Sequence, residues 1–271
     1  MAMSSVLDRL ASLGLVIVTG KGGVGKSSVT AALGRLLSNA GEEVLLLEVD
    51  PREIIDDLVR EKLKVKMLVN RVLASPIHQQ FTEAAPGLKE AAVFGRALRL
   101  LEGHNLPRRA ARPTTIVLDA PAAGHGVSWL AAPQLIADVI SAGPIGQMAR
   151  TVASFLENEK QSGVIVVTTG EEMPVQETLE LVSSMQGRLH RAPELVVANA
   201  LYPVPAGEPR SNDLATRLWI ERRRINDREL ARLADRWQGP IAHLPLLPLS
   251  PGPPLVGRLA SELQARIGAP S

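Results

Sequence analysis

The chain contains no cysteine and few aromatic residues, and each shortage excludes a kind of chemistry. Without thiols there can be no disulfides, iron–sulfur clusters, thiolate metal sites or cysteine nucleophile. Three tryptophans, one tyrosine and three phenylalanines are too few for a series of base-stacking platforms. Since the formal net charge is only +2, the composition gives no reason to expect a nucleic-acid partner.

Long apolar runs are also missing. Residues 1–14 lack the basic flank and apolar stretch of a secretory signal, and no run of about 18 apolar residues could cross a membrane. We therefore expect a cytoplasmic protein whose contact with membranes, if any, is indirect. Of the 271 residues 45% are hydrophobic, which is enough for a large core, and we expect one domain over residues 1–271.

Short apolar runs alternate with helical patterns along the chain. The runs are continuous, as in parallel strands that are buried on both faces. Strands are expected at residues 15–19, 43–49, 114–118, 163–168, 195–198 and 241–244. Helices are expected at residues 28–39, 86–102, 127–140, 144–158, 174–187, 213–237 and 254–267. This order predicts an α/β fold with a doubly wound, mostly parallel sheet and short helical additions at about residues 54–112 and 126–162.

A glycine-rich turn joins the first apolar run to the next helix. Residues 20–27 read Gly-Lys-Gly-Gly-Val-Gly-Lys-Ser and fit the phosphate-binding pattern G-x-x-x-x-G-K-[ST]. The glycines allow backbone N–H groups to converge on phosphate oxygens, and the helix directs its positive N-terminus at the anion. Lys26 would reach the β- and γ-phosphates, and the Ser27 hydroxyl would bind Mg²⁺. The predicted nucleotide-binding residues here are Gly20, Lys21, Gly22, Gly23, Val24, Gly25, Lys26, Ser27 and Ser28.

Two aspartates come directly after apolar runs. Asp50 can orient a water molecule or reach Mg²⁺ through water, and it can also cap a helix that begins at Pro51; the two roles are compatible. Asp119 follows an apolar run in the Walker-B manner and would hold Mg²⁺ through water. The Ala-Pro-Ala-Ala-Gly-His-Gly sequence that follows can change conformation at its glycines, including Gly124, when the γ-phosphate is lost. We therefore interpret His125 as a switch residue.

A second lysine distinguishes this phosphate loop. Lys21 directly follows the first glycine, a variant that resembles the deviant Walker A loop of dimerising P-loop NTPases of the SIMIBI class. That class includes the MinD/ParA group, the nitrogenase iron protein and the ArsA/Get group. In these proteins the extra lysine contacts phosphate across a dimer interface, and the resemblance implies the same role for Lys21.

Over almost its whole length the chain resembles the ArsA/Get family of anion-transporting and tail-anchored-protein-targeting ATPases. Residues 48–51 and 119–126 resemble the two switch segments of that family, and residues 166–178 resemble its strand and Glu-Pro segment. Residues 195–199 resemble the strand that ends in the adenine-reading asparagine, and residues 243–248 resemble the segment that closes the adenine pocket.

The resemblance implies a dimeric ATPase that uses ATP and Mg²⁺ and switches between states that bind and release a client. It implies switch residues at Asp50, Pro51, Asp119, Pro121, Gly124 and His125, catalytic residues at Lys21, Lys26 and Asp50, and adenine contacts at Asn199 and Pro245. The partner would be a second copy or a related ATPase chain, and the client a protein or an anion. A MinD/ParA-like spatial-organising ATPase remains the alternative.

Departures from the family limit what it implies for this chain. The arsenite-binding thiolates and the Cys-x-x-Cys zinc clasp of other members are absent, and the chain is one half rather than a tandem pair. These features indicate the short, single-half bacterial branch. The second addition is nevertheless apolar, and its large side chains could serve core packing or a client or dimer surface. They are Trp129, Leu130, Leu135, Ile136, Val139, Ile140, Val152, Phe155 and Leu156.

Overall fold

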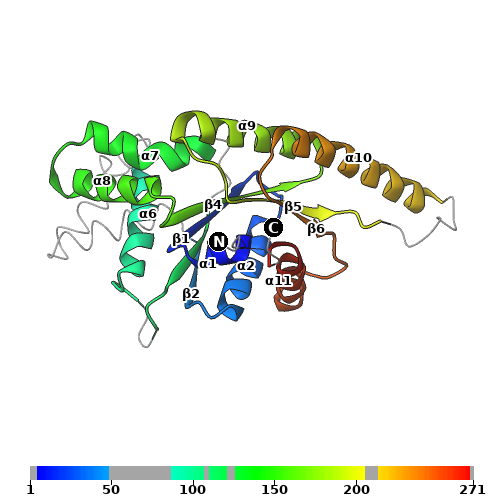
Figure 1. Ribbon diagram of the computed structural model, residues 1–271, viewed down its shortest axis with the longest axis horizontal. Coiled ribbons are helices and arrows are strands. Elements are labelled where there is room, and N and C mark those ends of the chain that lie inside the picture. The colour runs from blue at the N-terminus through cyan, green and yellow to red at the C-terminus, as the bar shows by residue number, and fades with distance from the viewer. Residues whose placement is uncertain (1–4, 49–86, 107–109, 121–125, 205–212, 269–271) are drawn as a thin grey trace, which may run out of the picture.

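A computed structural model describes residues 5–48, 87–106, 110–120, 126–204 and 213–268 of the chain. The described residues form one parallel sheet with helices on both of its faces (Figure 1). The predicted α/β doubly wound fold is therefore confirmed. No helix in the described parts of the chain is both long and apolar enough to cross a membrane.

The sheet has the strand order β2-β3-β1-β4-β5-β6, and all neighbouring strands are parallel. The strands are β1 (Leu15–Gly20), β2 (Val44–Glu48), β3 (Thr115–Asp119), β4 (Ser162–Thr169), β5 (Leu195–Leu201) and β6 (Ile241–Pro245). The central strands β1 and β4 are almost fully buried, which explains their continuous apolar sequence. β1 lies between β3 and β4, so the strand order reverses direction at β1. In sheets of this kind ligands bind at the carboxyl ends of the strands beside such a reversal, which is where the loop after β1 lies.

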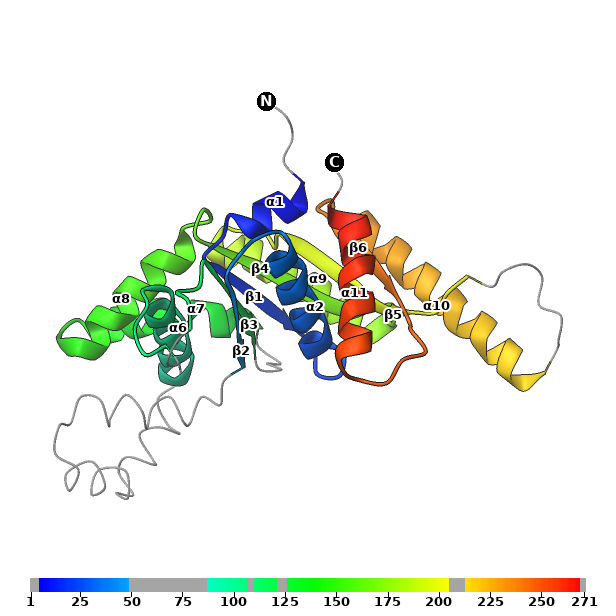
Figure 2. The ribbon, with the colours of Figure 1, turned by 90° about the horizontal axis from the view of Figure 1, so that it is seen from below.

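Each face of the sheet is covered by its own set of helices (Figures 1 and 2). One face carries α1 (Val6–Ala11), α2 (Lys26–Asn39) and α11 (Pro253–Ile267). The other carries α6 (Leu88–Leu101), α7 (Gly126–Val139), α8 (Gly143–Glu157), α9 (Glu172–Leu189) and α10 (Leu214–Arg236). The expected helices are all present with ends that shift by a few residues, whereas α1 is an addition to the prediction. Its sequence signal is a capping box, in which Ser5 and Asp8 each bond the other's backbone N–H.

The apolar residues of α7 and α8 mostly serve the core. Trp129 is 7% exposed and stacks at a tilt against Phe94 of α6, with ring centroids 4.4 Å apart. Leu135 and Val139, by contrast, are 56% and 81% exposed. Of the two alternatives left open for this segment, core packing thus accounts for the buried members, and the surface alternative is confined to the exposed ones. The buried members include Leu130, Ile136, Val152 and Leu156.

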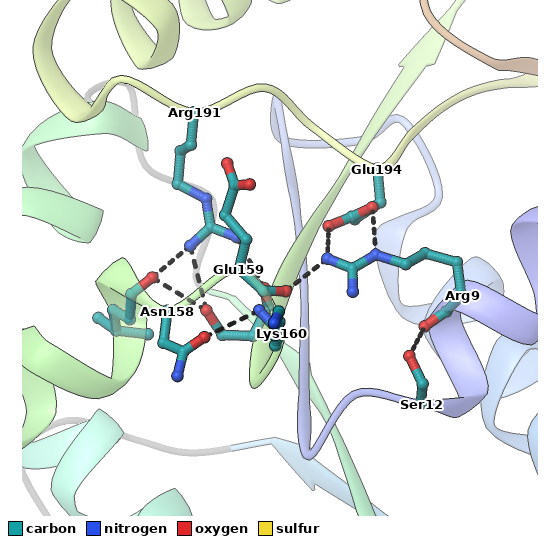
Figure 3. A network of polar contacts seen from close by, with 9 residues as sticks. Arg9, Ser12, Asn158, Glu159, Lys160, Arg191 and Glu194 are labelled. Carbon is teal, nitrogen blue, oxygen red and sulfur yellow. Dashed lines mark hydrogen bonds and ion pairs between the residues drawn. The ribbon is translucent and has the colours of Figure 1, made fainter.

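A polar network ties the edge of the sheet where the strands begin (Figure 3). The guanidinium group of Arg191 donates to the backbone oxygen of Leu156 at the end of α8 and to both oxygens of Ser162 at the start of β4. Arg9 of α1 forms an ion pair with Glu194, at 2.8 Å, and also donates to the backbone oxygen of Glu159. These bonds connect α1, α8 and the loop before β5, so their role is structural.

Candidate functional site

The glycine-rich loop runs from the end of β1 to the start of α2 and is pressed against the neighbouring strands. A Cβ atom on Gly20 would lie 2.1 Å from the backbone oxygen of Val167 in β4. A Cβ atom on Gly25 would lie 2.4 Å from the side-chain nitrogen of Asn199 in β5, and the φ of Gly25 is +87°. Only glycine fits at either place, so the loop can lie against the end of the sheet with its backbone exposed to a ligand.

The first turn of α2 is arranged to receive an anion. Its capping residue is Gly25, which offers no side-chain acceptor, and the turn contains no acidic residue. Ser27 and Ser28 also lie in this turn, and each carries a hydroxyl group. A helix N-terminus with unsatisfied donors, and a partial positive charge, favours phosphate.

Lys26 is a buried cation with little to stabilise it. Its side chain is 8% exposed, and its ammonium group donates to the backbone oxygen of Lys21 at 3.0 Å. Burial lowers the pKa of Lys26 below its ordinary value of 10.5, and the charge of Asp119 opposes this only in part. A single neutral oxygen is a weak partner for a desolvated ammonium, which would gain a great deal from a phosphate.

Asp119 lies at the end of β3, next to Val18 of β1. Its Oδ1 atom is buried and has no hydrogen-bond partner, and the same holds for the hydroxyl of Thr30 on α2. Unpaired buried polar atoms are rare because each costs free energy, and the one on Asp119, beside the strand that leads into the phosphate loop, is available to a ligand.

The described part of the site offers two oxygen atoms of the kind that bind Mg²⁺. Within the described ranges no group of three His, Cys, Asp or Glu side chains could hold a metal ion. Mg²⁺ binds through one or two protein oxygens together with phosphates and water. The Ser27 hydroxyl and the unpaired oxygen of Asp119 supply such a set.

Asn199 lies under the phosphate loop. Its register partner in β4 is Thr169, and its side-chain nitrogen donates to the backbone oxygen of Val24 at 2.9 Å. Just beyond it the strand is irregular, because Ala200 has a φ of +54° and the pairing with β6 shifts its register. Pro245, on β6, is the register partner of Leu201, so the two residues expected at the adenine lie on adjacent strands.

Lys21 has a partner that the sequence did not reveal. Its ammonium group forms an ion pair of 2.5 Å with Glu177, one and a half turns into α9. Glu177 lies within the segment 166–178 that resembles the family, but no property of that segment singles out this acid. The contact arises from the three-dimensional placement of α9 over the loop, which a linear pattern does not contain.

The structure thus brings together the loop, Asp119 and Asn199 at one edge of the sheet. Asp50, Pro51, Pro121, Gly124 and His125 all lie outside the described residues.

Parts of this chain are similar to known ATPases. The profile of a family described as "Anion-transporting ATPase" matches residues 13–71, which include the whole phosphate loop. ATPase BagA of Mycobacterium tuberculosis is 30% identical over 217 residues, which is 66% of this chain and 62% of the relative. These matches support an ArsA/Get-type ATPase.

More distant relatives carry other names of this family. ATPase GET3 of Malassezia globosa is 21% identical over 266 residues, covering 76% of this chain and 78% of the relative. A putative arsenical pump-driving ATPase 2 of Aquifex aeolicus is 29% identical over 109 residues, covering 37% of this chain and 36% of the relative. The chain spans about six tenths of the length of the mycobacterial relatives it matches, so this similarity alone does not transfer their whole activity.

Proposed function

We propose that the protein binds and hydrolyses ATP and that two protomers pair around the nucleotide. The observation that carries this proposal is the state of Lys26, a buried cation with one neutral acceptor at the N-terminus of a helix. ATP supplies what these groups lack. Its phosphates accept from Lys26 and from the first-turn N–H groups of α2, and its charge offsets the cost of burying the ammonium.

Two further residues fit the rest of the nucleotide. Asn199 carries a carboxamide, which can both donate to and accept from the adenine edge, and Pro245 lies on the adjacent strand. Ser27 would hold Mg²⁺ directly and Asp119 through water, and the bound ion would neutralise phosphate charge. Catalysis is then mainly positioning and electrostatic stabilisation.

The remaining steps depend on the residues that the family resemblance assigns. Asp50 would orient the water that attacks the γ-phosphate in line, and Lys21 would contact the phosphate of the opposite protomer. Loss of the γ-phosphate would relax the segments after Asp50 and Asp119, with Pro51, Pro121, Gly124 and His125 as the switch residues. Because α7 begins at Gly126, directly after the second switch, this change would reach α7 and α8 and alter binding of a protein client in the cytoplasm.

The experiment measures ATP affinity by calorimetry and phosphate release by a coupled assay on the purified chain. We expect wild type to bind ATP with Mg²⁺ and release phosphate. Lys26→Ala should bind no ATP, whereas Asp50→Asn should bind ATP and release no phosphate. Lys160→Ala, which removes an exposed lysine at the opposite edge of the sheet, serves as the control. Unchanged ATP affinity in Lys26→Ala refutes the binding site, and full turnover by Asp50→Asn refutes the role given to Asp50.

A further inference from the structure

Contacts within the same chain hold the phosphate loop in place. Lys26 donates to the backbone oxygen of Lys21, and the Lys21 side chain pairs with Glu177. At the other end of the loop, Asn199 donates to the backbone oxygen of Val24. Residue 21 is therefore held twice, at its carbonyl group by one lysine and at its ammonium group by an acid.

The pair between Lys21 and Glu177 is close but accessible to solvent. The two side chains are 35% and 41% exposed, and their charged atoms are 2.5 Å apart. An ion pair with this exposure is screened by water and contributes modestly, so it can be exchanged for a stronger acceptor. The multiply charged phosphates of ATP are such an acceptor.

We propose that Glu177 is a positioning residue that holds Lys21 in its own chain until ATP is bound on a facing protomer. This inference rests on the proposed function, because it assumes that Lys21 acts across a pair of protomers. It adds a competition: the ammonium of Lys21 pairs either with Glu177 or with a phosphate of the facing site. Pairing of two copies in the absence of nucleotide is thereby disfavoured.

The two holds on residue 21 connect nucleotide binding to release. When ATP binds, the ammonium of Lys26 moves to the phosphates and leaves the carbonyl of Lys21 without its donor. The backbone at residue 21 is then free to shift, which weakens the geometry of the pair with Glu177. Occupation of a protomer's own site thus prepares its Lys21 to reach across.

The test compares Glu177→Gln with wild type. The matched control is Glu180→Gln, which removes an exposed carboxylate on the same helix that accepts from Gln176 and not from the loop. Dimerisation is measured by sedimentation in a non-hydrolysable ATP analogue with Mg²⁺. Reactivity of the Lys21 amine toward an acylating reagent is measured by mass spectrometry in nucleotide-free protein.

We expect Glu177→Gln to strengthen dimerisation because each protomer no longer has to break the pair. An exposed ion pair corresponds to about threefold per protomer, and the two protomers of a dimer together give about tenfold. Acylation of Lys21 should rise about threefold in Glu177→Gln, stay unchanged in Glu180→Gln, and return toward wild type in Glu177→Asp.

The direction in which Glu177→Gln changes dimerisation tests the inference. Dimerisation of Glu177→Gln that equals wild type, or is weaker, overturns the inference while leaving the ATP-dependent dimer in place. A wild-type protein that binds ATP yet stays monomeric at all concentrations refutes the paired function, and the competition at Lys21 with it. Acylation of Lys21 that does not respond to Glu177→Gln also refutes the inference.

Discussion

Two buried cations lie at opposite ends of the parallel strands and differ in how many hydrogen bonds they make. Arg191 lies where the strands begin, and Lys26 lies where they end. Arg191 and Lys26 are each 8% exposed, and burial lowers the pKa of both. Arg191 donates to three oxygen atoms of Leu156 and Ser162, and only its Nε lacks a partner (Figure 3). Lys26 donates to one backbone oxygen and lies near an aspartate whose buried Oδ1 is unpaired.

The difference separates a structural site from a binding site. A buried charge whose hydrogen bonds are made within the fold stabilises the elements that it connects. A buried charge with few partners costs stability in the free protein and returns that free energy when a ligand of opposite charge binds. The edge of the sheet that carries Arg191 should therefore govern stability, and the edge that carries Lys26 should govern affinity.

The largest expected effect is at the binding edge. Lys26→Met removes the ammonium that would contact the phosphates, and ATP affinity should fall about a thousandfold, as for other buried charge partners. The midpoint of thermal unfolding without nucleotide should stay within about 3 °C of wild type, because a costly buried charge is lost along with one hydrogen bond. Calorimetric titration measures the ATP affinity, and thermal unfolding of the same preparation measures the midpoint. A large loss of stability with retained ATP affinity would show that Lys26 is a structural residue and not a binding residue.

Arg191→Ala should show the opposite pattern. The change leaves the oxygen atoms of Leu156 and Ser162 without their donor in a buried place, at a cost of about 3 kcal/mol. The unfolding midpoint should fall by about 6–12 °C, and ATP affinity at 20 °C should stay within about twofold. Denaturant unfolding and nucleotide titration provide the measurements, with Arg188→Ala, on the exposed surface nearby, as the control. Weakened ATP binding in a folded Arg191→Ala protein would contradict the separation.

Asn199→Ala tests a residue that is expected both to support the fold and to bind ATP. Its side chain supports the loop through Val24 and is also placed to contact adenine. Loss of the bond should cost about 1 kcal/mol of stability and about tenfold in ATP affinity. GTP, whose purine edge differs, should lose less affinity than ATP. Asn39→Ala, an exposed asparagine at the far end of α2, is the control. Equal losses for both nucleotides would assign Asn199 to loop support alone.

The smallest expected effect is the uptake of a proton by Lys26 when ATP binds at alkaline pH. The pKa of Lys26 lies below 10.5 in the free protein, and bound phosphates should raise it. Between these two pKa values ATP binding takes up a fraction of a proton, so affinity falls as pH rises through this window. The free protein changes in the opposite sense, since the unfolded chain binds more protons there and unfolding becomes harder as pH rises. Calorimetry in buffers of different ionisation enthalpy reports the uptake, and its absence would show that Lys26 does not meet the phosphates.

The sequence predicted the strands and the phosphate loop because both are local patterns. The continuous apolar runs indicated parallel strands that are buried on both faces, and the spacing of glycines, Lys26 and Ser27 indicated the loop. The pairing of Lys21 with Glu177 was not predictable, because it joins residues 156 apart in the chain through the packing of α9. For the same reason composition could not separate the exposed Leu135 from the buried Leu130 on one helix, a difference that depends on which face meets the core.

The most direct test of the account is the mass of the purified chain in solution, by light scattering, with Mg²⁺ and either a non-hydrolysable ATP analogue or ADP. Because Lys26 has one neutral acceptor and Lys21 is proposed to exchange Glu177 for a phosphate of the facing protomer, we expect twice the protomer mass with the ATP analogue and the protomer mass with ADP. Lys21→Ala should bind the analogue and remain at the protomer mass. A wild-type protein that binds the analogue at saturation and stays at the protomer mass would contradict the account.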